Sequence, residues 1–328
     1  MIVHEKSTWL RTLLMWRGSS LTRTWPRVLF VTSVAGAVTW VHETYGWLHT
    51  NLTVTPFSLI GLALGIFLGF RNNTSYDRFW EGRKLWGRVV NASRSLTRQL
   101  LTFVGPSEGV GEAYRYAARE GAGPDEVHAF HRRLVYQVVA YVHALRLHLR
   151  DQDRLEELAP FLEESEVEAL RPELNRPIAL LQRIGAELRG AHDRGWIHAY
   201  HLPVLEGSLT ELAGVQGGCE RIKATPIPFS YNILLHRIVF VYCFFLPFGL
   251  VSIEGLGPFT PAVVLMVSYA FFGLDAVGDE IENPFGEDDN DLPLSAITRM
   301  IEVNLREVLG QKEGLPPMRG PDHRGILM

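Results

Sequence analysis

Hydrophobic residues gather in four stretches of the chain, which form two pairs on either side of a long polar middle. The stretches cover residues 28–41, 54–70, 238–253 and 259–274. Each is near or below the roughly 17–25 residues with which a helix spans a bilayer, so any one alone could be a buried helix of a soluble core. Their pairing across short loops favours transmembrane helices. We therefore predict an all-α integral membrane protein with four spans per subunit.

Basic residues give these spans an orientation. Lysine and arginine crowd the segment before the first stretch and the residues after the second, whereas the loop 42–53 contains neither. The loop between the third and fourth stretches carries Glu254 as its one charged residue. Because cytoplasmic flanks of membrane helices are enriched in Lys and Arg, both termini and the middle are predicted to be cytoplasmic. We expect a multi-pass protein of the cell's inner membrane.

The polar middle predicts a helical cytoplasmic domain, because its apolar residues recur at three- and four-residue spacing. Asp125 follows a Gly- and Pro-containing loop and is a candidate N-cap. The predicted organisation has six parts. They are a cytoplasmic N-terminal segment 1–27, a transmembrane pair 28–70, a helical domain 71–228, a second pair 229–274, an acidic loop with a C-terminal helix 275–313, and a Pro- and Gly-rich tail 314–328 that we expect to be disordered.

Composition narrows the function classes. The net charge of −4 argues against a nucleic-acid partner, because a phosphate backbone needs a basic face. The two cysteines, Cys219 and Cys243, form no CxxC pair, so neither a disulfide framework nor a zinc site is indicated. The sequence also lacks the HExxH, GxSxG and GxxxxGK[ST] motifs. We predict that the chain is not an enzyme and name no catalytic residue.

Three polar features can each be interpreted as a functional site or as an ordinary structural feature. The acidic run 280–291 has the oxygen ligands that a hard cation such as Ca²⁺ prefers, although composition alone favours an acidic surface loop. The glutamates between 163 and 168 form either a cation-attracting wall or, as we favour, a solvated helix face. His236 and Arg237 open the third span, where polar residues are functional candidates, but snorkelling to the interface is the favoured interpretation.

The second span carries a possible pore face. Leu62, Ile66 and Phe70 are spaced i, i+4, i+8 and therefore lie on one side of a helix. Around a symmetry axis, such residues would form stacked apolar rings, which can gate a channel by dewetting. The span is apolar all round, so periodicity alone favours ordinary helix packing for these three residues.

Four motifs resemble the bestrophin family of ion channels, in its bacterial branch. They are Trp16–Ser19, Phe67–Asn73 with Ser75–Trp80, Pro226–Tyr231 leading into His236-Arg237, and Asn283–Asp289. The resemblance extends from about residue 5 to 295, and the last two motifs are specific at that order and distance.

The resemblance implies a homopentamer with one central pore. It places Leu62, Ile66 and Phe70 on the pore-lining face of the neck and Ile178 at a second constriction, the cytosolic aperture. Asp288 and Asp291 fall on side-chain positions of the calcium clasp of eukaryotic members, so calcium or another divalent cation is a possible cofactor. The sequence departs from that pattern at Asn290, where eukaryotic members keep an acid.

These observations predict passive conduction of monovalent cations, with sodium favoured. Bacterial bestrophins are associated with sodium, and the acidic net charge, multiplied over a pentamer, favours cations as well. An anion channel of the same architecture is one alternative, because eukaryotic bestrophins conduct chloride. A membrane-anchored scaffold without conductance is the alternative from another class. The expected partners are the other subunits, the lipid bilayer and the permeant ions.

Overall fold

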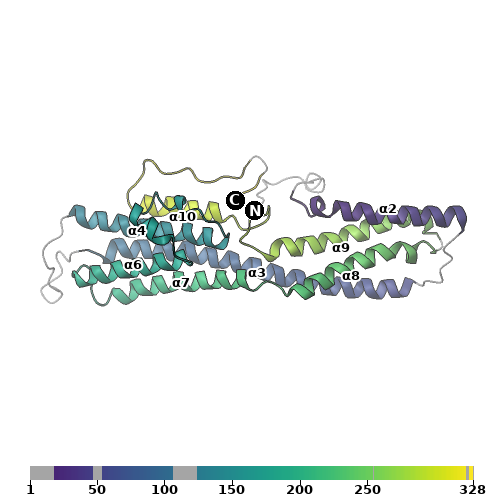
Figure 1. Cartoon of the computed structure of the whole chain (residues 1–328), viewed down its shortest axis with the longest axis horizontal. Coiled ribbons are helices and arrows are strands. Elements are labelled where there is room, and N and C mark those ends of the chain that lie inside the picture. The colour runs from purple at the N-terminus through teal and green to yellow at the C-terminus, as the bar shows by residue number, and fades with distance from the viewer. Residues whose placement is uncertain (1–17, 47–53, 106–123, 254, 323–324, 328) are drawn as a thin grey trace.

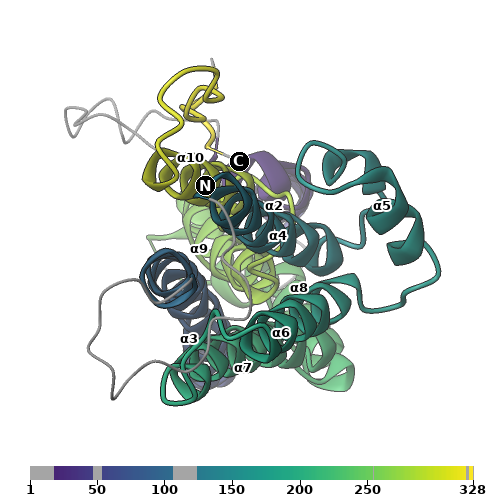
Figure 2. The same cartoon turned by 90° about the vertical axis from the view of Figure 1, so that its left-hand side faces the viewer.

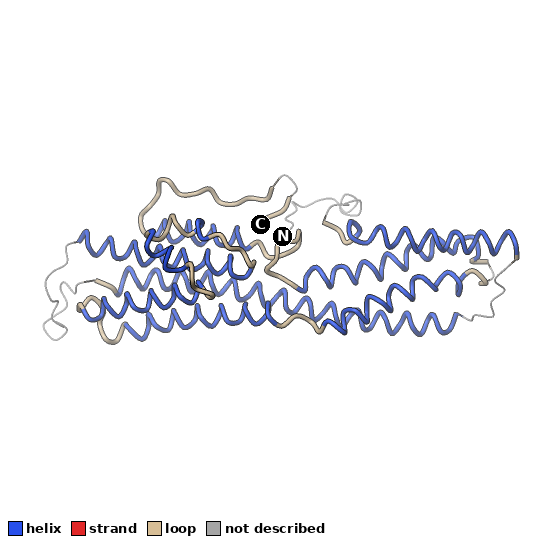
Figure 3. Tube along the Cα trace, in the orientation of Figure 1, coloured by secondary structure: helices blue, strands red, loops and turns tan. Residues whose placement is uncertain are grey.

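The described part of the protein is built from helices and loops. The computed structural model describes residues 18–46, 54–105, 124–253, 255–322 and 325–327. Within these ranges Figure 3 draws helices and loops and no strand, and Val104 and Ile197 form an isolated antiparallel β-bridge. The all-α prediction is confirmed for this part of the chain. Trp16, Arg17 and most of the predicted outer loop at 42–53 lie outside it.

The helices form an elongated bundle with two halves (Figure 1). One half contains α2, α8, α9 and the first part of α3, and the other contains α4, α6, α7, α10 and the rest of α3. In chain order the elements are α2 (Leu21–Tyr45), α3 (Val54–Phe103), α4 (Pro124–Leu149), η2 (Leu155–Glu157), α5 (Glu164–Leu170), α6 (Arg176–Asp193), α7 (Leu202–Ala224), α8 (Phe229–Leu250), η3 (Gly257–Phe259), α9 (Thr260–Glu282) and α10 (Leu294–Val308).

Helix α3 joins the two halves without a break. It has 50 residues, which at 1.5 Å per residue makes it roughly 75 Å long. Leu68 is buried in the core of the first half, and Trp86 is buried in the core of the second. The predicted boundary at residues 70 and 71 therefore lies inside one helix, because a change from apolar to charged residues does not by itself interrupt the backbone hydrogen bonds, and the single Gly69 beside it is tolerated within α3.

The first half has the composition of a membrane domain. Three helical segments are long and apolar enough to cross a bilayer: α3, α8 and Gly257–Glu282. Helix α2 has 25 residues and packs along α9, but it is not among these three segments. The fourth span therefore stays a prediction.

The second half is a helical bundle with its own core. Seen end-on in Figure 2, α4 lies between α10 on one side and α6 and α7 on the other. Leu134 and Tyr141 of α4 are fully buried, and the Tyr141 hydroxyl donates a hydrogen bond to the Leu212 carbonyl at 3.0 Å. The N-cap prediction for Asp125 is wrong. Helix α4 begins at Pro124, which is suited to the first turn of a helix, so Asp125 lies inside that turn.

The chain after α10 is described as loop. Arg306 donates a hydrogen bond to the Gly314 carbonyl at 3.3 Å, and the Asp322 N–H donates to the Ile326 carbonyl at 2.9 Å. Ile326 is buried. Disorder of the tail 314–328 stays a prediction.

Acidification is expected to weaken the second half of the molecule through His143. Burial lowers the pKa of this histidine, against the opposing effect of Glu302, which lies 3.2 Å from its Nε2 atom. His143 is then neutral when folded and takes up a proton on unfolding, so its contribution is complete above the ordinary pKa of about 6.5 and is lost as the pH falls below it. One proton changes the free energy of unfolding by at most about 1.4 kcal/mol per pH unit.

Denaturant midpoints of the wild type and His143→Gln at about pH 7.5 and about pH 5.5 measure this effect. The variant is expected to lose less stability on acidification. Burial also lowers the pKa of His131, so both proteins are expected to lose some further stability on acidification. An equal loss in the two proteins would contradict the role of His143.

Candidate functional site

The predicted neck residues lie on an uncovered face of α3. Leu62, Ile66 and Phe70 are 65%, 51% and 63% exposed in the single chain. On the other side of the same helix, Leu64 and Leu68 are buried in the core of the membrane half, where α3 packs against α8 and α9. An apolar face of this size needs lipid, another subunit or a pore beside it. The structure thus brings the three residues together on one line, and their role in a neck stays a prediction.

A buried ion-pair network begins directly after the predicted neck residues, at Arg71. The Arg71 side chain is fully buried, and its Nη1 atom lies 2.8 Å from Asp275 Oδ1. Its Nη2 atom pairs with Asp279, one turn further along α9. His236 of α8 lies 2.7 Å from Asp275 through Nδ1 and 3.5 Å from Asp279 through Nε2. Arg27 of α2 approaches Asp275 to 4.0 Å. The network therefore joins all four helices of the membrane half.

The network pairs buried charges with one another. A buried charge without a partner would destabilise the fold. His236 points to the two aspartates, so the snorkelling interpretation is wrong for it. Arg71, Asp275 and Asp279 had no assigned role in the sequence. A signal existed, because Asp275 and Asp279 are spaced i, i+4 immediately after the fourth apolar stretch, and Arg71 comes immediately after the second.

The same side chains could also hold a metal ion. One ligand atom each of His236, Asp275 and Asp279 lies within 4.8 Å of the others, and in the described residues this is the one such group of three. The Arg71 guanidinium, however, already donates to both carboxylates. Arg71 and Arg27 supply two positive charges against the two carboxylates, so the group is balanced without a metal.

The predicted metal residues lie in the acidic loop after α9. Asp291 is buried, and burial raises its pKa to about 7. Its Oδ2 atom accepts a hydrogen bond from the Asp288 N–H at 2.7 Å. A Cβ atom at Gly286 would approach the same oxygen to 2.5 Å, which explains why a residue without a side chain stands there. The Oδ1 atom of Asp291 is buried without a hydrogen-bond partner, and an oxygen of this kind suits a cation.

Arg23 supplies a positive charge to this loop. Its Nη2 atom lies 3.0 Å from Asp288 Oδ1 and 4.0 Å from Glu280 Oε1. Asn290 donates from Nδ2 to Glu280 Oε1 at 3.1 Å, so the residue that departs from the eukaryotic pattern serves as a donor. The loop has the oxygen atoms that calcium prefers, but a cation at Asp288 would have to displace Arg23. Calcium binding stays a prediction.

Removal of this arginine is expected to strengthen calcium binding. In Arg23→Gln the carboxylates of Asp288 and Glu280 lose their internal counter-charge and become available to an ion. Loss of a competing ion pair worth about 1 kcal/mol corresponds to an affinity gain of about fivefold. Isothermal titration of both proteins with calcium chloride measures the effect. The exposed Arg83 on α3 provides the control Arg83→Gln, and equal affinities in all three proteins would contradict the idea.

The predicted aperture residue lies in the first turn of α6. Ile178 is 40% exposed, and its N–H donates to the Asn175 side chain at 3.3 Å. Asn175 also accepts a hydrogen bond from Gln216 at 2.8 Å, which fixes this N-cap to α7. The apolar side chain of Ile178 is therefore presented at a rigid helix start. Its role in a constriction stays a prediction.

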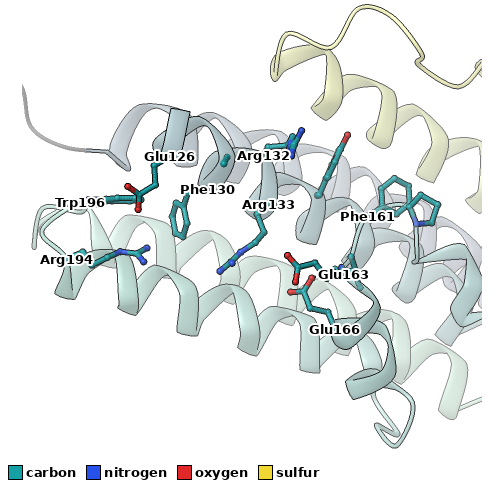
Figure 4. A pocket seen from close by; sticks show the side chains of 13 residues that line it. Glu126, Phe130, Arg132, Arg133, Phe161, Glu163, Glu166, Arg194 and Trp196 are labelled. Carbon is teal, nitrogen blue, oxygen red and sulfur yellow. Dashed lines mark hydrogen bonds between the residues drawn. The ribbon is translucent and has the colours of Figure 1, made fainter. Parts of the chain in front are cut away.

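A pocket of about 500 Å³ lies at the end of the bundle remote from the membrane half (Figure 4). Arg194 stacks over Trp196 and Phe130, at 4.4 and 5.1 Å from the ring centroids. Glu163 and Glu166 lie side by side in Figure 4 and form a capping box at the start of α5. These acids therefore serve the helix itself, which supports the solvated-face interpretation of the acidic run over a cation-attracting wall.

Comparison with known proteins identifies the family. The family described as "Bacterial/Fungal Bestrophin protein" matches residues 1–307. The chain belongs to the bestrophin family. A voltage-dependent anion channel-forming protein of Ralstonia nicotianae is 40% identical to this bestrophin over 95% of both chains. The voltage-dependent anion channel-forming protein YneE of Escherichia coli K12 is 36% identical over 98% of both.

A solved structure shares the fold. The bacterial bestrophin homolog from Klebsiella pneumoniae is 37% identical, with a TM-score of 0.77, and the match covers 87% of this bestrophin and 98% of that chain. The family predicted from the motifs is confirmed. As a bestrophin the chain is a membrane ion channel and not an enzyme, so the scaffold alternative is set aside.

Proposed function

We propose that the chain forms a homopentamer around one central pore, through which ions pass passively. The observation that carries this proposal is the uncovered line of Leu62, Ile66 and Phe70 on α3. Helix α2 lies on the other side of α9 (Figures 1 and 2). Symmetric packing with α3 innermost would turn the apolar line toward the axis and leave α2 at the periphery.

The proposed path has two constrictions. Ions would cross the neck rings, follow the charged half of α3 through the cytoplasmic bundle, and leave past Ile178. Apolar rings carry little fixed charge, so they control wetting more than they choose the sign of the ion. The same proposal places the protein in the inner membrane with both termini cytoplasmic, which a reporter fused to the C-terminus tests.

Anions are the first candidate for the permeant ion. The relatives that are 33–40% identical bear the name of anion channel-forming proteins, and this observation supports anions over the cation preference expected from the sequence. Monovalent cations are the second candidate, and the net charge of −4 per chain favours them. That charge counts residues far from any pore, which makes it the weaker argument.

Reversal potentials in planar bilayers test the proposal. Purified protein is reconstituted with a gradient of sodium chloride, and we expect a current whose reversal potential moves toward the chloride equilibrium potential. A reversal potential near that of sodium would establish the cation alternative. Bilayers that received detergent without protein are the control. Absence of current from both the wild type and Ile66→Ala would refute the channel.

A further inference from the structure

A pocket opens between α2, α8 and α9 at the end of the membrane half that adjoins the cytoplasmic bundle. Its volume is about 320 Å³. Its lining combines charged side chains with phenylalanines: Arg27, His236, Phe240, Phe272, Asp275 and Asp279. No residue of α3 lines it. We propose that this pocket binds a membrane phospholipid whose headgroup carries both a phosphate and a primary amine.

The position of the pocket points to lipid. Figures 1 and 2 show α2 and α3 on opposite sides of α9, and the pocket lies where α2 meets α8 and α9. If α3 lines the pore, as proposed above, an opening beside α2 faces the periphery. Three helical segments of the membrane half are apolar enough to cross a bilayer, so an opening on that periphery would meet lipid.

The charges of the pocket suit a zwitterion. Arg27 stands at the rim with 54% of its side chain exposed, and Asp279 has 40% of its side chain exposed. An arginine is the preferred partner of a phosphate, and a carboxylate accepts hydrogen bonds from an ammonium group. Arg71 and Arg27 together balance Asp275 and Asp279, so the site offers separated charges of both signs with no net excess. An anionic headgroup without an amine would leave Asp279 without a new partner.

An exposed aromatic row continues from the pocket along the membrane helices. The Phe240 ring is exposed and stacks on Phe30 of α2 with centroids 6.4 Å apart. The ring centroid of Phe244, one turn further along α8, lies 6.3 Å from that of Phe30. Because α8 runs away from the cytoplasmic bundle after His236, this row extends into the membrane half from the charged pocket. Flat apolar rings in this position suit an acyl chain whose headgroup occupies the pocket.

The amine is the decisive feature. A primary ammonium donates hydrogen bonds, whereas the trimethylated amine of a choline headgroup has no N–H to donate. The ethanolamine and choline headgroups have the same charge and the same phosphate. A difference in their binding therefore reports on the hydrogen bond from the amine to Asp279. A hydrogen bond to a charged group contributes enough to change binding about tenfold.

Native mass spectrometry of the full-length protein in detergent tests the proposal. Phosphatidylethanolamine, phosphatidylcholine and phosphatidylglycerol with identical acyl chains are added at equal concentrations, and the retained lipid is counted. We expect about tenfold preference for phosphatidylethanolamine over phosphatidylcholine. Asp279→Asn is expected to abolish this preference. Arg27→Gln is expected to reduce the binding of both lipids equally, because it removes the contact with the phosphate.

Two matched variants control for charge alone. Asp77→Asn and Arg237→Gln make the same changes at exposed positions outside the pocket lining, and they should bind like the wild type. Equal retention of the ethanolamine and choline lipids by the wild type, or preferential retention of the glycerol lipid, would overturn the proposal. If Asp279→Asn does not fold, the proposal is tested by the retention of the three lipids on the wild type and on Arg27→Gln. The readout is lipid retention, so the result is independent of whether the protein conducts ions.

Discussion

Replacement of Arg71 with methionine is expected to lower the stability of the membrane half by about 3–5 kcal/mol. Methionine fills much of the volume but removes the guanidinium that donates to Asp275 and Asp279. Asp275 is 1% exposed, so its charge loses a partner where water cannot replace it. A closer approach of His236 to Asp275 offsets part of the loss, which places the expected effect at the lower end of this range.

Thermal unfolding in detergent, followed by size-exclusion chromatography with fluorescence detection, measures the change. The control is Arg83→Met, which makes the same substitution at an exposed position of α3 and should be close to neutral. A second variant combines Arg71→Met with Asp275→Asn and Asp279→Asn, and removal of the unpaired charges should restore most of the stability. A triple variant as unstable as Arg71→Met would show that the packing of Arg71, rather than its charge, matters.

The helices of this bestrophin follow from its sequence better than their boundaries do. The four apolar stretches fall largely within α2, α3, α8 and α9, and the three- and four-residue spacing indicated that the polar middle is helical, because burial in a bundle needs one apolar face per helix. The end of the second span at Phe70 was not a helix end, since the pattern records where the surroundings change from lipid to water. The backbone of α3 continues through that change.

In the candidate site, too, the sequence predicted some features and missed others. Leu62, Ile66 and Phe70 fall on one face by spacing alone, and the structure leaves that face uncovered. The partners of Arg71 were beyond local patterns, because Asp275 follows it by 204 residues. The contact of Arg23 with Asp288 is equally remote in sequence. Periodicity describes one helix at a time, whereas such ion pairs depend on how helices distant in the chain are packed.

The buried ion-pair network around Arg71 lies on α3 between the proposed neck and the second half of the molecule. Arg71 follows Phe70 directly and is fixed by two carboxylates of α9. Seven residues later, Arg78 donates to the carbonyls of Ile222 at 2.7 Å and Glu282 at 3.0 Å. Arg71 and Arg78 therefore fix α3 to α7 and α9 next to the proposed neck. A neck that opens by wetting, with little movement of α3, is consistent with this anchoring.

Replacement of Ile66 with alanine is expected to raise single-channel conductance by several-fold, up to about tenfold. Alanine widens the middle ring of the proposed neck and lessens its apolar surface, so water and ions enter at a lower free-energy cost. A barrier that is lower by about 1.4 kcal/mol increases the rate of passage about tenfold. Ile66 is 51% exposed in the chain, so its truncation leaves no closed cavity and should affect folding little. Single-channel recording in planar bilayers at symmetric salt measures the change.

The matched control is Ile60→Ala on the same helix. Ile60 is 46% exposed, but it lies roughly 120° around α3 from Ile66 at 3.6 residues per turn. An increase restricted to Ile66→Ala would assign the pore to the face of Leu62, Ile66 and Phe70. Equal increases in both variants would mean that loosened packing admits ions, and an increase restricted to Ile60→Ala would move the pore to another face of α3. The sign of the permeant ion should not differ between the variant and the wild type, because neither isoleucine nor alanine carries charge into the neck.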